Sequence, residues 1–366
     1  MQNKPIILFV VALFSTILLF AQTETTTWAP TIKVKALVHS RFEASLTDSV
    51  DVQNKFSTDP IRANFRMRRV ELRTDIKLND KFSGVVRIQL PELKGSNIGR
   101  TIELAYMEYK CIDGFQIRAG QFKLPYELDE LTSHEDLRMI DRGTTSVMFV
   151  TNNLASYQPG IMVFGNFLKD KTPLNYYFAF VNGSSRAVNY DDNSQKNLVG
   201  RIEYSFIKGM RLGVNGQYIS IKDTSSNSFG VDLSIQKNIT KKTKLIVEGE
   251  YIQGIATTTF VADTNGLEIN EFAMGGYFGQ VLFKIDIEKP WCKTFEIGGK
   301  FENTDPNTTI DANDFTTITG NIGFTFLPDN TARLQLNIVN TKWASPISSG
   351  GIDASNIFLA QFQLKI

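Results

Sequence analysis

Apolar and polar residues alternate most plainly in the stretch RANFRMRRVELRTDIKL, residues 62 to 78. With a period of two, one face of this stretch is apolar and the other is charged, and the phase slips once, between Arg68 and Arg69. A period of two predicts a β-strand, and a single slip predicts a β-bulge. In a soluble sandwich the charged face would meet bulk water. In an outer-membrane barrel it would line the lumen, while the apolar face would meet lipid.

The same alternation recurs along the chain and predicts sixteen strands. They are expected at about residues 31–43, 62–78, 81–90, 100–110, 114–123, 157–168, 173–182, 196–207, 209–222, 226–238, 242–256, 270–288, 292–303, 313–327, 330–343 and 355–366. Short connections alternate with longer ones. Residues 223–225 stand where a longer connection is expected but are short, so they fit the alternation least well. This arrangement is typical of outer-membrane barrels. The sequence therefore predicts an all-β fold, a closed antiparallel transmembrane β-barrel with both termini at the periplasmic rim.

The first 21 residues have the pattern of a targeting segment. Lys4 precedes an apolar run from Ile6 to Phe20, and Ala21 is a small residue at the expected cleavage point. The run is shorter than the ~20 residues that a spanning helix needs. We therefore expect a secretory signal peptide at residues 1–21, with an N-terminal anchor as the alternative, and a barrel formed by residues 22–366.

Charge and composition narrow the possible partners. Lysine and arginine number 39 against 38 aspartate and glutamate, so nothing favours nucleic acid as a partner. Two histidines and two cysteines show no metal-ligand spacing, and no cofactor motif is found, so we expect neither metal nor cofactor. Cys111 and Cys292 would lie on distant strands of the ring and are expected to be free thiols. Abundant aromatic residues, with 27 phenylalanines and 11 tyrosines, fit a chain facing lipid.

The arginines of the stretch at residues 62–78 are the first candidate functional group. If the charged face lines the lumen, they form a column of fixed positive charge along the path of a solute, and such a column stabilises anions. Its members are Arg62, Arg66, Arg68, Arg69 and Arg73. The alternative is structural pairing with lumen carboxylates such as Glu71, Asp75, Glu103, Glu108, Glu248 and Glu250.

The long segment at residues 124–156 is the third outer connection and the second candidate group. We expect it to fold into the lumen and narrow it, and the alternative is that it lies over the mouth. It is acidic, with Glu127, Asp129, Glu130, Glu135, Asp136 and Asp141. An acidic loop opposite a basic wall would set up a transverse field, which selects polar solutes by size and dipole and need not favour anions.

Several segments resemble the phosphate-selective porin O and P family. They are RRVELR at 68–73, KFSG at 81–84, AYMEYK at 105–110 and, most specifically, IRAGQFKLPYELDELTS at 117–133. The resemblance covers essentially the whole chain after residue 21. It implies a sixteen-stranded, usually trimeric outer-membrane porin. By position it makes Arg66, Arg68, Arg69 and Arg73 candidates for the arginine ladder of the family, and we find no equally clear lysine cluster.

The expected function is passive diffusion of small hydrophilic solutes across the outer membrane, with anions such as phosphate as one candidate class. The expected partners are those solutes, outer-membrane lipid and two further copies of the chain. One alternative is a non-conducting barrel that binds at the cell surface or is structural. Another is a barrel hydrolase, which would need a base beside a nucleophile. The only histidines are His39 and His134, and His134 follows Ser133. We expect no enzyme.

Overall fold

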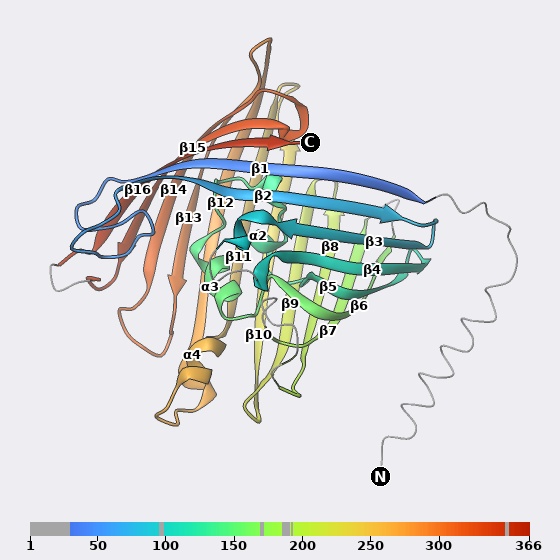
Figure 1. Ribbon diagram of the computed structural model, residues 1–366, viewed down its shortest axis with the longest axis horizontal. Helices are drawn as coiled ribbons and strands as arrows, with labels where there is room; N and C mark the ends of the chain where they lie inside the picture. The colour runs from blue at the N-terminus through green and yellow to red at the C-terminus, as the bar shows by residue number, and fades with distance from the viewer. Residues whose placement is uncertain (1–29, 95–98, 169–171, 185–190, 192, 348–350) are drawn as a thin grey trace, which may run out of the picture.

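The computed structural model describes residues 30–94, 99–168, 172–184, 191, 193–347 and 351–366. Its sixteen strands form one closed barrel, in which each strand pairs with its neighbours in sequence (Figure 1). They are β1 Thr31–Ser45, β2 Ala63–Lys77, β3 Phe82–Gln89, β4 Ile102–Ile112, β5 Phe115–Lys123, β6 Tyr157–Phe167, β7 Leu174–Val181, β8 Asn197–Ile207, β9 Met210–Ile221, β10 Thr224–Asn238, β11 Thr243–Ile255, β12 Ala273–Lys289, β13 Cys292–Asp305, β14 Phe315–Thr325, β15 Ala332–Trp343 and β16 Ala354–Lys365. The predicted all-β, sixteen-stranded closed barrel is confirmed. The expected signal peptide at residues 1–21 lies outside the described residues.

The barrel closes where its first strand meets its last. Leu37 of β1 lies opposite Lys365 of β16, and Ser45 lies opposite Ile357. Past the end of β16, Ala36 and Ile366 exchange two backbone hydrogen bonds of 2.9 Å. Because the pairing is antiparallel and the strand count is even, the start of β1 and the end of β16 share one rim. Closure leaves no unpaired strand edge to be desolvated by lipid.

Side chains of the strands alternate between an exposed apolar face and a buried polar face. In β8, Arg201 and Glu203 are buried, whereas Ile202 between them is 56% exposed. In β13, Lys300 is buried and the next residue, Phe301, is exposed. A charged side chain on a lipid-facing surface costs ~2–4 kcal/mol near the membrane midplane. The exposed apolar face is therefore the lipid-facing one, and the charged face lines the lumen.

Strand β2 contains the β-bulge that the phase slip predicted. His39 of β1 lies opposite Arg69, and the next residue, Ser40, lies opposite Met67, so Arg68 is the extra residue. A bulge bends the strand and re-aims the side chains beside it. As a result, the consecutive residues Arg68 and Arg69 both face the lumen, where they line one cavity.

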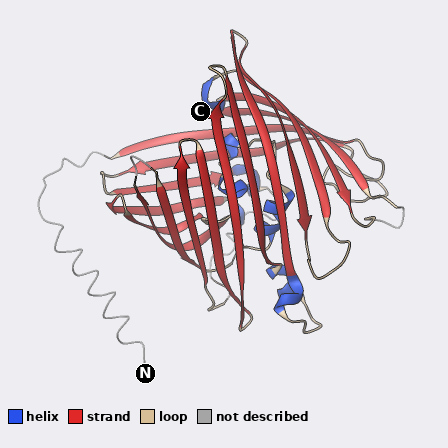
Figure 2. Cartoon of the chain, turned by 180° about the vertical axis from the view of Figure 1, so that it is seen from behind, coloured by secondary structure: helices blue, strands red, loops and turns tan. Residues whose placement is uncertain are grey.

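The connection between β5 and β6, residues 124–156, is here called the third loop, and it folds into the barrel (Figure 2). It contains α2 Leu128–Leu131, η3 His134–Asp136 and α3 Thr144–Thr151. The amide of Leu128 donates to Glu250 on β11, and the amide of Ile140 donates to Asn337 on β15. The ring of His134 also bonds to Glu71 on β2, far around the barrel from β11. The loop thus crosses the lumen, and its predicted inward position is confirmed.

The remaining helical segments are short and lie in connections. They are η1 Leu90–Leu93, α4 Thr257–Ala262, η4 Ile269–Phe272 and η5 Pro328–Asn330. No helix in the described part of the chain has the length and apolar character to cross a membrane. Cys111 and Cys292, on β4 and β13, are free thiols as predicted.

The two arms of the third loop pack against an apolar part of the barrel wall. The cluster joins loop residues to lumen-facing residues of β5 to β12, and includes Phe122, Leu124, Tyr126, Phe149, Leu154, Met162, Ala179, Val199, Ile219, Ile252 and Met274. Protein interiors packed in this way leave no room for water. At the height of the loop arms, the passage is therefore confined to the other side of the lumen, along β13 to β16 and β1 to β3.

Candidate functional site

Two cavities lie in the lumen on either side of the third loop. The outer cavity has a volume of about 790 Å³ and extends to Gln53 and Asn54 in the first outer loop. The inner cavity, of about 580 Å³, extends to Gly209 in the periplasmic turn between β8 and β9. The segment from α2 to η3 borders both cavities. This segment therefore lies between the two cavities.

Each arginine of the predicted column has a carboxylate neighbour. From the outer end, the nitrogen-to-oxygen distances are 2.9 Å for Arg62–Asp48, 2.6 Å for Arg66–Glu43, 3.9 Å for Arg68–Asp141, 3.9 Å for Arg69–Glu71 and 2.6 Å for Arg73–Asp75. The outer cavity is lined by Arg66, Arg68 and Arg69. Arg62 lies just before β2, towards the outer loop, and Arg73 lies further along β2, towards the periplasmic turn. The column is therefore paired, and its three central members also line the outer cavity.

Pairing leaves donors of Arg68 and Arg69 unused. Nε of Arg68 and Nη1 of Arg69 are buried without a hydrogen-bond partner among the described residues. The carboxylate contacts of the two side chains, both made by Nε at 3.9 Å, are too long to be hydrogen bonds. A buried donor left unsatisfied costs ~1–3 kcal/mol, and more for a charged group. The two atoms themselves are buried, so an anion in the outer cavity would meet the part of Arg68 that is exposed, 34% of its side chain.

The six acidic residues of the third loop do not form one face. Three of them are held within the loop or by β13: Glu127 accepts from the Asp129 amide and caps α2, Asp129 pairs with Lys300 at 2.7 Å, and Glu130 pairs with Arg142 at 2.8 Å. Asp136 lines the inner cavity, and the Glu135 carbonyl and the Asp136 carboxylate both accept from Asn330. Glu130 and Asp141 line the outer cavity. Glu43, Glu92, Glu103 and Glu302 line the same cavity, so carboxylates of the loop and of the barrel wall together oppose the arginine wall.

Arg41 of β1 is a lumen residue that sequence reasoning did not select. It is 1% exposed, and its two terminal nitrogens hold the carboxylate of Asp141 at 2.7 and 2.8 Å. Desolvation raises the pKa of Asp141, but Arg41 and Arg68 outweigh it and hold the pKa below its usual range. The alternation of β1 placed Arg41 on the polar face. Its partner, 100 residues away, carried no local signal.

The inner cavity has a basic wall that sequence reasoning also missed. Arg211, Lys244 and Lys284 line it together with Arg138 of the third loop. Arg138 pairs with Glu248 at 2.8 Å and Lys284 pairs with Glu296 at 2.8 Å. The three wall residues come from β9, β11 and β12, so they do not form a cluster in the sequence.

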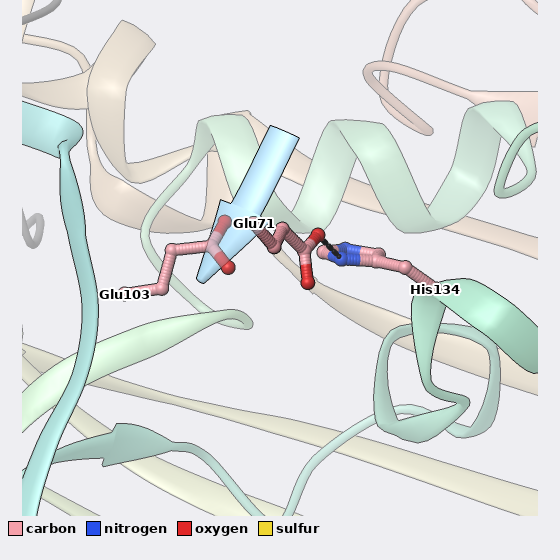
Figure 3. Close-up of side chains that lie close together, drawn as sticks. All are labelled: Glu71, Glu103 and His134. Carbon is pink, nitrogen blue, oxygen red and sulfur yellow. Dashed lines mark hydrogen bonds and ion pairs between the residues drawn. The ribbon is translucent and has the colours of Figure 1, made fainter. Parts of the chain in front are cut away.

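Glu71, Glu103 and His134 bring ligand-type atoms within 4.8 Å of one another (Figure 3). The ring Nδ1 of His134 bonds to the carboxylate of Glu71. Arg87 lies 2.9 Å from Glu103 and 3.7 Å from Glu71, and Arg69 is also close to Glu71. Burial, and then Arg69 and Arg142, lower the pKa of His134 well below its usual value, so the ring is neutral. Arginines already neutralise both carboxylates. The trio is therefore part of a network of ion pairs and hydrogen bonds that anchors η3 to β2.

The adjacent Ser133 and His134 are not arranged as a nucleophile and its base. The hydroxyl of Ser133 donates to Asp136 at 3.0 Å, and His134 is bonded to Glu71. His39, on β1, bonds to Gln363 at 2.8 Å. In the described part of the chain, neither histidine is hydrogen-bonded to a serine.

The family described as phosphate-selective porin O and P matches residues 42–260 of the chain. No curated protein sequence matches this chain. Among solved structures, the anion-selective porin from Comamonas acidovorans aligns with a TM-score of 0.60 and 10% identity, covering 92% of this chain and 100% of that one. The outer membrane channel DcaP of Acinetobacter baumannii aligns with a TM-score of 0.57 and 13% identity, covering 94% of this chain and 99% of that one. A trimer form of OmpT of Vibrio cholerae aligns with a TM-score of 0.55 and 10% identity, covering 92% of this chain and 100% of that one. At these identities the likeness is one of fold.

Proposed function

We propose that this chain, which belongs to the phosphate-selective porin O and P family and is a passive channel of the outer membrane, prefers small anions. The observation that carries the proposal is the exposure of Arg66 and Arg68 in the wall of the outer cavity, where Arg68 has no carboxylate contact shorter than 3.9 Å. The family match bears out the sequence-based resemblance and favours a channel over an enzyme.

The outer cavity attracts anions through the arginines of β2. The side chains of Arg66 and Arg68 are 41% and 34% exposed, so they remain in contact with water while their field reaches the solute. Fixed charges lining a narrow wet path shift the local concentration of permeant ions and lower the barrier for the opposite sign. Asp141 opposes this field, but Arg41 lies on its carboxylate and offsets its charge.

The inner cavity continues the path for an anion that has passed the third loop. Arg211 is 34% exposed there and has one carboxylate contact, to Glu203 at 3.5 Å. Its neighbours in the lining include Lys244 and Lys284. Cationic groups at successive heights allow an anion to move between sites without entering a region of unfavourable potential.

Replacement of each ion in turn tests the proposal. Purified protein in a planar bilayer conducts potassium chloride, and gluconate or Tris then replaces chloride or potassium. Because both substitutes are bulky, the conductance falls mainly when the preferred ion is replaced. We expect the larger fall with gluconate. A larger fall with Tris would contradict anion preference and leave the channel function intact.

We also propose that the channel is a homotrimer. The support is the family resemblance and the similar fold of OmpT, for which a trimer form is described. The mass of the detergent-solubilised protein, corrected for bound detergent, tests the proposal. We expect the mass of three chains, and the mass of one chain would contradict the trimer.

A further inference from the structure

The outer cavity has an apolar wall in addition to its basic wall. Helix α3 of the third loop presents Val147, Met148 and Val150 to this cavity. Val147 is 53% exposed although it lies inside the lumen. Exposed hydrocarbon in a wet lumen costs free energy, at ~25 cal/mol for each Å². An ion surrounded by water on all sides would gain nothing from this surface.

The barrel wall contributes a second apolar surface to the same cavity. Lumen-facing positions of β15 and β16 carry Val339, Ile357 and Leu359, where a water-filled barrel usually has polar residues. Ile140 of the third loop packs on Ile357 and Leu359 and buries them, while Val339 remains partly exposed. Met139 lines the cavity beside them. The apolar lining thus continues from the loop to the wall.

The cationic surface of the cavity lies on β2, where the guanidinium groups of Arg66 and Arg68 are partly exposed. One cavity of about 790 Å³ therefore offers hydrogen-bond donors for an anionic group and an apolar surface for a hydrocarbon body. Inorganic phosphate would satisfy the donors but would leave the apolar surface in contact with water. A carboxylate with a hydrocarbon chain or ring would use both surfaces.

We propose that the outer cavity is a binding site for organic carboxylates with an apolar body, and that these are preferred to inorganic phosphate. The carboxylate accepts from Arg66 and Arg68, and the hydrocarbon body lies against Val147 and Val339. This inference rests on the proposed passage of anions and specifies their class. It does not require the whole solute to be buried, since the cavity opens towards the outer loops.

Block of the chloride current tests the preference. Hexanoate, acetate and phosphate are added in turn to protein in a planar bilayer at about pH 8, where both carboxylic acids are ionised. A fully buried methylene strengthens binding about fourfold. With partial burial of its four extra methylenes, hexanoate should halve the chloride current at a concentration about tenfold below that for acetate. Phosphate should need a higher concentration than hexanoate.

Two variants link the preference to the apolar wall. The concentration that halves the chloride current is compared as a ratio, acetate over hexanoate. Val147→Ser should reduce this ratio by about threefold, because part of the apolar wall becomes polar. Val261→Ser, in α4 of an outer loop and equally exposed at 48%, is the matched control and should keep the ratio of the unmodified protein. Equal block by hexanoate and acetate, or stronger block by phosphate, overturns the inference while a chloride current remains. A protein without any chloride current overturns both this inference and the proposed function.

Discussion

Arg41 and Asp141 join the first strand of the barrel to the middle of the third loop. Two hydrogen bonds, of 2.7 and 2.8 Å, connect the guanidinium of Arg41 with both carboxylate oxygens of Asp141. Such bidentate pairs fix orientation as well as distance. Asp141 also lies 3.9 Å from Arg68, so one carboxylate serves both the docking of the loop and the charge balance of the outer cavity.

Replacement of Asp141 by asparagine should increase anion preference. Asparagine keeps the size of the side chain and one acceptor, but removes a negative charge beside the solute path. A unit charge at roughly 8 Å in a water-like medium changes the energy of an ion by about 0.5 kcal/mol, which is about a twofold effect. The ratio of chloride to potassium permeability, obtained from the reversal potential, should rise by about that factor.

Asp311→Asn is the control for Asp141→Asn. Asp311 is exposed in an outer loop, so the loss of its charge should leave the ratio unchanged. A ratio that stays constant or falls in Asp141→Asn would show that Asp141 does not act on the permeant ion.

At Gly143 the third loop lies against β13. Its amide donates to Asp129 at 2.6 Å, and an added methyl group would lie 2.5 Å from Nζ of Lys300 and against the carboxylate of Glu302. Excess volume at a packed contact costs ~1–3 kcal/mol. Gly143→Ala should therefore loosen the docked loop, and trypsin should cleave after Arg138 or Arg142 at least about fivefold faster.

Gly200→Ala is the control for Gly143→Ala, because no atom lies within 4 Å of the methyl group that it would add. Its cleavage rate should equal that of the unmodified protein. Similar rates for both variants would contradict a close contact between the loop and β13.

Glu127 should make the docking of the third loop sensitive to pH. Its carboxyl group interacts with Glu250, which also accepts from the amide of Leu128. Burial, and then Asp129, raise the pKa of Glu127 from 4.5 to about 7. The docked loop thus holds this proton more tightly than a released loop does. Docking is favoured in full below about pH 4.5, and it loses stability as the pH rises to about 7.

Amide hydrogen exchange in residues 127–142, corrected for its intrinsic dependence on pH, measures this effect. Protection in the unmodified protein should fall between about pH 5 and pH 8. In Glu127→Gln the fall should be much smaller, since glutamine has no charge to lose, although it keeps only one of the two acceptor oxygens that cap α2. Glu135→Gln is the control and should retain the full pH dependence. An equal fall in both variants would exclude Glu127 as the source.

The barrel could be predicted from the sequence because each strand must present one face to lipid. The cost of a charge in lipid imposes a period of two on every strand. That pattern located the ends of β2 to within one residue and its bulge at Arg68 and Arg69. The hairpin between β9 and β10 was correctly singled out as short. Lys222 and Asp223 both have positive φ there and join the strands directly.

The interior of the barrel could not be predicted in the same way. Contacts in the lumen join residues that are far apart in the sequence, such as Lys300 with Asp129 or Arg41 with Asp141, and no periodicity encodes them. Composition showed that the third loop is acidic, but not that half of its acidic residues are held within the loop or by β13. Apolar residues at inward positions, such as Ile219 and Ile252, had no evident reason until the loop packed against them.

The reversal potential in a potassium chloride gradient, compared between the unmodified protein and the double variant Arg66→Gln/Arg68→Gln, tests most directly whether the arginines of β2 set the selectivity. Both arginines line the outer cavity, and their side chains are 41% and 34% exposed. Their replacement leaves the buried Arg41 and Arg69 in place. We expect a potential that indicates chloride preference in the unmodified protein and a clear shift towards potassium in the double variant. The same potential in both proteins, or potassium preference in the unmodified protein, would contradict an anion path along β2.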